Sequence, residues 1–411
     1  MRILHVNKFL HRRGGAEAYM LDVAALQARS GHEIEYFSMA HPMNLPSRFE
    51  SHFPEQIELN PPPSSVGGKL RGAGRLLYSP AARRGMEQVL EVFRPDVVHL
   101  HNIYHQLSPS ILRPLENKGI PAVMTLHDYK LACPTYLFLD HGQVCEACLG
   151  GRFYNAVLKR CNDGSLLASS LNALELTLHT AAKSYSPVRI FLCPSRFLIG
   201  KMNEAGVYPD RLRLLPNFVD VHRIKPGAEG GSKVVYAGRL SSEKGVDVLI
   251  EAAAPSGVEL DIAGDGPERA SLEMLARRLG VTVRWHGHLP QEALHDLVRT
   301  AAVSVLPSRC HENQPLGLLE SFACGVPVIG TTLGGIPDLI RSGTNGDLVP
   351  PNDPPALSAA LQRLLSDPQR AHEMGRAARV GVESEFSPEL HLQRLEQRYA
   401  EAISMTRRAP I

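Results

Sequence analysis

The sequence predicts an α/β protein with two doubly wound domains that face each other across a cleft. Short apolar runs alternate with helical patterns along the chain, as expected for parallel sheets covered by helices. The 411 residues are too many for one ordinary domain. A Pro- and Gly-rich stretch at 224–232 is typical of a linker. We therefore expect a first domain at 1–214, a second at 215–387 and a C-terminal helix at 388–411 that crosses back onto the first.

In the first half, five apolar runs are predicted to be strands, and helical periods follow several of them. The expected strands are 3–7, 33–38, 97–102, 122–127 and 190–195, and the expected helices are 16–29, 81–93 and 197–205. The segment 41–79 is irregular, and 128–165 is interpreted as an insertion.

The second half repeats this alternation more regularly. The expected strands are 234–237, 259–263, 282–286, 303–307, 327–330 and 346–349, and the expected helices are 245–253, 268–279, 291–300, 316–323, 355–365 and 388–404. Ligands of doubly wound sheets bind beyond the carboxyl ends of the strands, so the strand-to-helix loops are where we expect the chemistry.

The composition limits the classes of partner that the protein is expected to bind. The formal net charge is only +2, which argues against a nucleic-acid partner. No run approaches the 18 or more apolar residues of a membrane span, and the first residues form a strand rather than a signal peptide. We expect a cytosolic protein, or one bound peripherally at the inner face of a membrane. Basic residues gather at Lys69, Arg71, Arg75, Arg83 and Arg84, either as a solvated face or as a contact for an anionic surface.

The first chemical motif is the loop at 311–320, which follows a predicted strand and opens a helix. Glu312 and Glu320 stand eight residues apart, one on the loop and one a turn into the helix. The free N–H groups and positive dipole end of a helix start, here at Leu316 and Gly317, favour phosphate. The alternative is an ordinary capped helix with one solvated and one buried glutamate.

Two further loops point to the same cleft. Arg239 and Lys244 lie on one strand-to-helix loop, where two cations can clamp a diphosphate. An ordinary surface loop with an ion pair, such as Glu243 with Lys244, is the alternative. Gly14 and Gly15 follow the first strand and allow a ligand close to the backbone, although such a pair is often only a turn.

Together these motifs resemble glycosyltransferase family 4, the retaining enzymes of the GT-B architecture, and the resemblance covers essentially the whole chain. Five more segments occur in the order that the family shows: PDVVHLHN at 95–102, TLHD at 125–128, CPS at 193–195, LPNFVD at 215–220 and AGDGP at 263–267. The sequence departs from the usual motifs at Pro315 and Phe218, where the family commonly has glycine.

The resemblance implies two Rossmann-like domains and transfer of a sugar from a nucleotide-diphospho-sugar to an acceptor hydroxyl, in glycan or polysaccharide synthesis. It assigns the donor diphosphate to Arg239 and Lys244, helped by the backbone at Gly14, Gly15, Leu316 and Gly317, the ribose to Glu320, the transferred sugar to Glu312, and the anomeric carbon and acceptor to His127. It also implies retention by front-side attack and no metal in the chemical step.

Histidines near the end of one predicted strand need separate interpretation. A single histidine such as His127 is often structural, but the TLHD context favours a role at the acceptor. His99 and His101 are expected to occupy core or supporting positions and to face opposite ways.

The insertion carries an independent signal. Cys133, Cys145, Cys148 and Cys161 have the spacing C-x11-C-x2-C-x12-C, which suits a structural zinc ion. Plain thiols or an iron–sulfur cluster are the alternatives. The other three cysteines, Cys193, Cys310 and Cys324, lie in apolar segments and are expected to be reduced core thiols.

Two other functions fit the same architecture: a nucleotide-sugar epimerase or hydrolase, and a non-catalytic nucleotide-sugar-binding subunit. A lipid-linked glycan, a polysaccharide or a small natural product would each suit the acceptor side, and the basic residues favour a membrane-surface acceptor.

Overall fold

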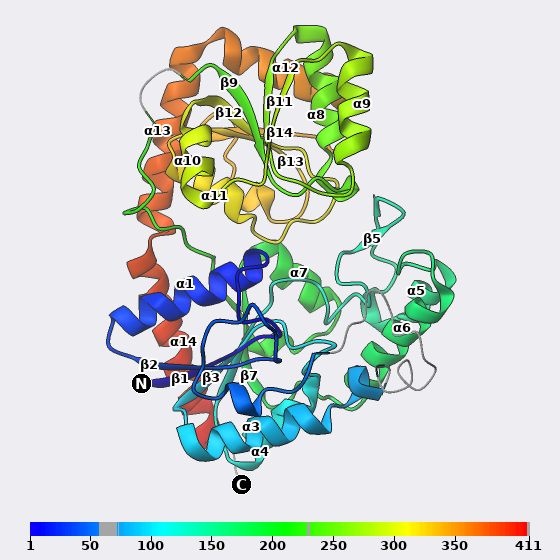
Figure 1. Ribbon diagram of the computed structural model, residues 1–411, viewed down its shortest axis with the longest axis vertical. Coiled ribbons are helices and arrows are strands. Elements are labelled where there is room, and N and C mark those ends of the chain that lie inside the picture. Colours follow the sequence, from blue (N-terminus) through cyan, green and yellow to red (C-terminus); the bar gives the residue numbers. More distant parts are fainter. Residues whose placement is uncertain (57–71, 73, 228–230, 409–411) are drawn as a thin grey trace.

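The computed structural model describes residues 1–56, 72, 74–227 and 231–408, and it forms two lobes, each with a sheet between helices (Figure 1). Of the basic residues grouped above, Lys69 and Arg71 lie outside the described residues. The predicted α/β class with two doubly wound domains is confirmed.

The first lobe is built on a six-stranded parallel sheet in the order β2-β1-β3-β4-β7-β8. Its strands are β1 (Arg2–Val6), β2 (Glu33–Phe37), β3 (Val97–Leu100), β4 (Ala122–Thr125), β7 (Val188–Cys193) and β8 (Leu212–Leu214). The central strands β3 and β4 are buried throughout, as expected where helices cover both faces of a parallel sheet. The short strand β8 was not predicted.

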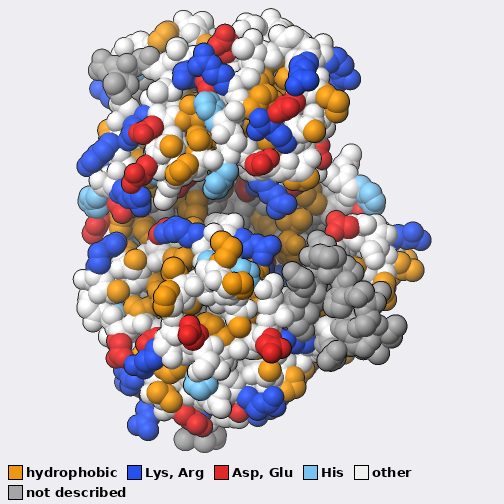
Figure 2. Space-filling view, viewed as in Figure 1, with side chains coloured by type: hydrophobic (Ala, Val, Ile, Leu, Met, Phe, Trp, Pro, Cys, Tyr) orange, Lys and Arg blue, Asp and Glu red, His pale blue; other side chains and the backbone are white. Residues whose placement is uncertain are grey.

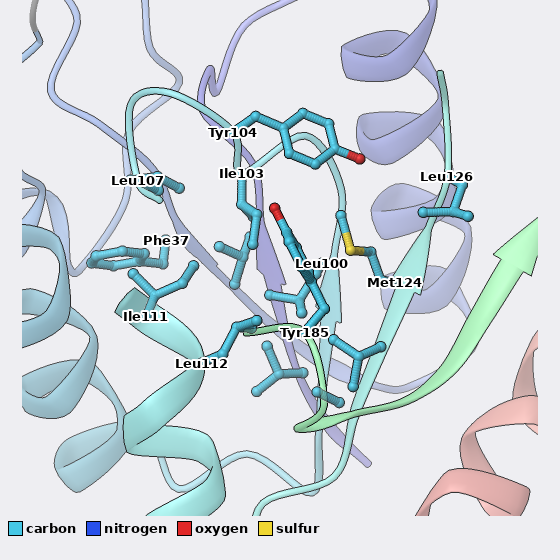
Figure 3. Packing of buried hydrophobic residues seen from close by; sticks show 14 of the residues in the cluster. Phe37, Leu100, Ile103, Tyr104, Leu107, Ile111, Leu112, Met124, Leu126 and Tyr185 are labelled. Atoms are coloured by element: carbon cyan, nitrogen blue, oxygen red, sulfur yellow. The ribbon is translucent and has the colours of Figure 1, made fainter. Parts of the chain in front are cut away.

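Helices α1 (Gly15–Arg29), α3 (Pro80–Phe93), α4 (Leu112–Asn117) and α7 (Arg196–Glu204) flank this sheet. Local sequence explains where two of them begin. The Ser79 hydroxyl accepts from the N–H of Ala82 ahead of α3, which has Pro80 in its first turn, and Ser195 caps α7 in the same way. Figure 3 shows Leu100 and Met124 from the sheet packed with Ile111 and Leu112.

The second lobe contains another six-stranded parallel sheet, in the order β11-β10-β9-β12-β13-β14. Its strands are β9 (Lys233–Ala237), β10 (Leu260–Ala263), β11 (Val283–Gly287), β12 (Ala301–Leu306), β13 (Val328–Thr331) and β14 (Gly346–Val349), and its helices are α8 (Val246–Ala253), α9 (Arg269–Leu279), α10 (Gln291–Arg299), α11 (Leu316–Ala323), α12 (Pro354–Ser366) and α13 (Pro368–Glu385). Two apolar clusters lie on the sheet: residues of α8, α9 and α12 form one, and residues of α10, α11 and α13 form the other.

The expected insertion at 128–165 contains a hairpin and a short helix, and a longer helix follows it. The hairpin strands are β5 (Leu139–Asp140) and β6 (Gln143–Val144), the short helix is α5 (Tyr154–Leu158), and the helix that follows is α6 (Leu166–Ala181). Lys130 Nζ lies 2.6 Å from Glu175 Oε2 on α6, and both side chains are almost fully buried. This ion pair anchors α6 to the segment that follows β4.

The chain returns to the first lobe through α14 (Pro388–Arg408), the red helix in Figure 1. Leu395, Tyr399 and Ala402 on α14 are buried in a cluster with Ile3 and Val123 of the first sheet. No helix among the described residues combines the length and the apolar character needed to cross a bilayer.

Candidate active site

The order of the strands creates a crevice at the end of each sheet. In the second sheet β9 lies between β10 and β12, so the loops that follow β9 and β12 lead to opposite sides of the sheet. In the first sheet β1 lies between β2 and β3 in the same manner. Ligands bind at such switch points. Figure 2 shows a hollow between the lobes with Lys and Arg side chains along its edges.

The loop between β12 and α11 is held by both lobes. Asn313 Nδ2 donates to the carbonyl of Leu126 (2.9 Å), and the Ser195 hydroxyl donates to Asn313 Oδ1 (2.9 Å). The side-chain oxygen of Gln314 accepts from the N–H of Asn217 in the connection between the lobes. The loop that carries Glu312 is therefore held by contacts to the first lobe and to the connection between the lobes.

Glu312 forms an ion pair with Lys244. Lys244 Nζ lies 2.6 Å from Glu312 Oε1, and the Ser308 hydroxyl donates to the same oxygen at 2.7 Å. Burial opposes ionisation of Glu312, but Lys244 and the hydrogen bonds outweigh it and hold its pKa below the usual value. Glu243, the partner that the sequence suggested for Lys244, accepts from the Ser241 hydroxyl instead.

Gly245 allows the loop that carries Arg239 and Lys244, the cationic loop, to pass close to the end of β12. Its φ is +67°, and a Cβ placed there would lie 2.1 Å from the carbonyl oxygen of Pro307. A side chain at this position would push the loop away from β12 and separate Lys244 from Glu312.

Arg239 is exposed and, within the described residues, has no ion-pair partner. It lies close to Tyr136 of the insertion: burial raises the pKa of that phenol, and the charge of Arg239 partly offsets the rise. The second lobe thus presents an unpaired guanidinium toward the first.

The start of α11 meets both the cationic loop and the first lobe. A Cβ on Gly317 would lie 3.9 Å from the carbonyl oxygen of Ala237, the last residue of β9. A Cβ on Gly15, the first residue of α1, would lie 3.8 Å from a methyl group of Leu316. The structure therefore brings the predicted glycines, helix start and cations to one region. Pro315 serves as the N-cap, so the helix begins at Leu316 despite the missing glycine.

Glu320 is partly exposed, one turn into α11. Its Oε1 accepts from Gln291 Nε2 at 3.2 Å and lies 3.7 Å from His295 Nε2. Gln291 and His295, both on α10, were not identified from the sequence, because only the packing of α10 beside α11 brings them to Glu320.

His127 follows β4 and is half-buried. Its Nε2 lies 3.0 Å from His101 Nδ1, and its ring packs edge-on against Tyr19. Burial lowers the pKa of His127 to about 3, so the ring is neutral at pH 7. His99 and His101 are buried as expected, but the prediction that they face opposite ways is wrong. Their rings stack with centroids 4.3 Å apart, because residues two apart on a strand point to the same face.

Phe218 occupies the second position where the sequence departs from the family. Its ring centroid lies 4.7 Å from that of His391 on α14 and 6.3 Å from that of Tyr19. The larger side chain therefore packs the connection between the lobes against the returning helix.

The four cysteines of the insertion are free thiols in one neighbourhood. Burial and the thiols of Cys133, Cys161 and Cys145 raise the pKa of Cys148 to about 12. Tetrahedral zinc would draw the sulfur atoms to about 3.8 Å from each other, given zinc–sulfur bonds of about 2.3 Å. Within the described residues, only His5, His99 and His101 form a group of three ligand atoms within 4.8 Å, so the sulfur atoms are more widely spaced. Cys193, Cys310 and Cys324 are buried free thiols.

Two family models together match most of the chain. The model of Glycosyltransferase Family 4 matches residues 13–223, and that of Glycosyl transferases group 1 matches 219–380. An alpha-D-kanosaminyltransferase of Streptomyces kanamyceticus is 36% identical over 38% of this chain and 42% of its own length. An exopolysaccharide phosphotransferase of Streptomyces coelicolor is 33% identical over 48% of this chain. The match covers only 22% of the length of that protein. A D-inositol 3-phosphate glycosyltransferase of Thermobispora bispora is 27% identical over 96% of this chain and 91% of its own.

Solved structures share the two-lobed fold. A sucrose-phosphate synthase of Thermosynechococcus elongatus superposes with a TM-score of 0.72 at 21% identity, covering 98% of this chain and 99% of the other. HepE of Anabaena, solved in complex with UDP-glucose, superposes with a TM-score of 0.66 at 18% identity, covering 98% of this chain and all of the other.

Proposed function

Because the chain belongs to glycosyltransferase family 4, whose model matches residues 13–223 of it, we propose that it moves a sugar from a nucleotide-diphospho-sugar to an acceptor hydroxyl with retention of configuration. The observation that carries this proposal is the meeting of Arg239, Lys244 and the start of α11 opposite Gly15. Two cations and a helix's positive end suit a diphosphate.

These groups act on the leaving diphosphate. The guanidinium of Arg239 and the ammonium of Lys244 take up the negative charge that develops as the sugar–phosphate bond breaks. Backbone N–H groups at Leu316 and Gly317 assist them. The charge that a divalent metal supplies in other transferases is thus available from this chain's own residues, and the chemical step runs without a metal.

Glu312 acts on the transferred sugar. When the donor diphosphate binds Lys244, the Glu312 carboxylate is released from its ion pair. It can then accept hydrogen bonds from sugar hydroxyls on the side where positive charge develops. The oxygen of the leaving phosphate removes the proton from the acceptor hydroxyl, so no residue of the chain forms a covalent intermediate. Glu320 binds the ribose and His127 lies beside the reacting hydroxyls. The glycosyltransferase activity of the Thermobispora relative and the UDP-glucose complex of HepE support this donor class.

The test incubates purified protein with mass-tagged donors and candidate acceptors in the presence of a chelator. We expect labelled acceptor from the wild type and a loss of about 10²–10³-fold in kcat/KM for Arg239→Ala, by analogy with removal of one preorganised donor. Arg277→Ala is the matched control, since Arg277 is 80% exposed on α9. An interconverted donor would indicate an epimerase, free sugar a hydrolase, and binding without turnover a non-catalytic subunit; each would overturn the proposal.

We also propose that Cys133, Cys145, Cys148 and Cys161 hold a structural zinc ion. They come from four points of the insertion, two of them are buried, and the thiols of Cys133, Cys145 and Cys161 are near enough to raise the pKa of Cys148. Zinc would pull the sulfurs together and tie the hairpin to α5. Metal analysis should give one zinc per chain, lost in Cys145→Ser but kept in Cys324→Ala. Metal-free protein would leave plain thiols, and visible absorption with bound iron would indicate an iron–sulfur cluster.

The insertion and the helix that follows it also support the prediction of an acceptor at a membrane surface. Large apolar side chains are exposed on α5 and α6: Tyr154, Leu158, Leu166, Leu167, Leu174 and Leu178. The exposed residues Arg152 and Arg160 flank α5 along the chain and Lys183 follows α6, whereas Arg83 on α3 forms an ion pair with Glu87. We propose that this face rests on an anionic bilayer. Vesicles with anionic lipid should co-sediment the wild type but not Leu167→Ser/Leu174→Ser, and equal binding by both would contradict the assignment.

A further inference from the structure

A series of side-chain hydrogen bonds runs through the first lobe from β4 to His127. Its successive members are Thr125, His99, Tyr399, Gln27, His5, His101 and His127. The side chains from Thr125 to His101 are buried. We call this series the histidine relay.

The amide of Gln27 fixes the direction of the relay. Its Nε2 can only donate, and it donates to the Tyr399 hydroxyl oxygen at 2.9 Å. Its Oε1 can only accept, so His5 Nε2, 2.8 Å away, must donate to it.

On one side of Gln27 the direction passes to the C-terminal helix and on to β4. The Tyr399 oxygen accepts from Gln27, so the Tyr399 hydroxyl donates its own proton to His99 Nδ1 at 2.8 Å. A neutral imidazole has one donor and one acceptor, so His99 Nε2 donates to the Thr125 hydroxyl at 2.7 Å.

The last steps set the ring of His127. Gln27 Oε1 accepts from His5 Nε2 at 2.8 Å, which leaves His5 Nδ1 as an acceptor for His101 Nε2 at 3.2 Å. His101 Nδ1 is then an acceptor and takes the proton of His127 Nε2 at 3.0 Å. His127 is left with a proton on Nε2 and none on Nδ1.

Two observations support this assignment. Burial keeps the rings neutral, lowering the pKa of His5 to about 4 and that of His127 to about 3. Ring nitrogens of His5, His99 and His101 lie as close together as the ligands of a metal site. Both nitrogens of each ring, however, already take part in hydrogen bonds of the relay.

The remaining nitrogen of His127 reaches the cleft. Within the described part of the chain Nδ1 has no hydrogen-bond partner, and it is not among the buried unpaired atoms, so it is open to solvent. The preceding residue, Leu126, is held by Asn313 of the second lobe, which places His127 where the lobes meet.

We propose that the histidine relay is a positioning device that keeps His127 in the single tautomer whose bare Nδ1 accepts a hydrogen bond from a sugar hydroxyl in the cleft. The sugar ligand rests on the proposed function, whereas the tautomer does not. Gln27 and Tyr399 are positioning residues: they act on the site only through the ring of His127. The C-terminal helix supplies Tyr399, which gives its return to the first lobe a role in the site.

The test measures the tautomer directly. Long-range ¹⁵N–¹H correlation spectra of protein labelled on histidine distinguish protonated from bare ring nitrogens, and comparison with His127→Gln assigns the signal. We expect the wild type to show protonated Nε2 and bare Nδ1. Gln27→Met and Tyr399→Phe each break the relay and should give a mixture of both forms. Tyr104→Phe is the matched control, because the buried Tyr104 hydroxyl has no hydrogen-bond partner among the described residues.

Activity provides the second readout. If two tautomers become equally populated, the competent fraction halves, and kcat should fall about twofold in Gln27→Met with no change in Tyr104→Phe. A wild type with protonated Nδ1, or variants that keep the wild-type tautomer, would overturn the relay. A confirmed tautomer in a protein without transferase activity would instead refute the proposed function and leave the relay standing.

Discussion

Replacing Lys244 with methionine should destabilise the protein and reverse the pH dependence that Glu312 contributes. The change removes the ammonium 2.6 Å from Glu312 Oε1 while keeping a side chain of similar length. Glu312 is then left with the Ser308 hydroxyl and the weak contact of Cys310.

The magnitude follows from the exposure of the pair. Removing one partner of a fully buried ion pair costs about 3–5 kcal/mol, and a surface pair contributes about 0–1 kcal/mol. The side chains of Lys244 and Glu312 are 26% and 13% exposed, between those limits, so we expect a loss of about 2 kcal/mol. Turnover should fall about 10²–10³-fold, because Lys244 also faces the diphosphate.

The sign of the pH effect distinguishes this pair from a general loss of packing. In the wild type the pKa of Glu312 is lowered, so its contribution is present above the unfolded value of about 4.3 and is lost as pH falls through the folded value. Without Lys244, burial raises that pKa, and stability is lost as pH rises above about 4.3. The deficit of the variant should therefore grow between about pH 4 and pH 6.

Urea denaturation of the wild type, Lys244→Met, Glu312→Gln and the double variant, repeated from pH 4 to pH 8, measures both quantities. Lys118→Met, which removes an exposed pair with Glu91, is the control and should change little at any pH. A coupling energy below about 0.5 kcal/mol, or a deficit of Lys244→Met that does not vary with pH, would refute the reasoning.

Three further outcomes are expected. Glu320→Ala should weaken donor binding about tenfold with a smaller change in kcat, because a ribose contact is the same in the ground state and the transition state. Titration calorimetry with a nucleotide diphosphate measures the Kd, and an unchanged Kd would contradict the assignment. Lys130→Met should cost about 3–5 kcal/mol in denaturant unfolding, because Glu175 is left buried without its cation, and a loss under 1 kcal/mol would count against the anchor. Gly245→Val should reduce both stability and turnover by displacing the loop from Pro307, and wild-type values would refute the steric argument.

Much of the architecture could be predicted from local sequence. Alternating apolar runs identified eleven of the twelve strands of the two sheets, because buried parallel strands are short apolar runs between helical periods. The expected helix at 316–323 coincides with α11. Helix α6 was not predicted, since leucines on its buried and exposed sides blur the helical period. Helix α13 was not predicted either, because its buried side consists partly of Ala371, Gly375 and Ala378.

The sequence by itself determined which residue types the cleft receives, because Arg239, Lys244 and Glu312 lie in loops that directly follow apolar strands. Their partners were decided by the tertiary structure. Lys244 pairs with a carboxylate 68 residues away rather than with its neighbour, and Gln27 meets Tyr399 across 372 residues. Strand order and the return of α14 bring such groups together. The residues next to a side chain along the sequence largely determine its secondary structure. Its hydrogen-bond partner depends instead on which elements pack against it.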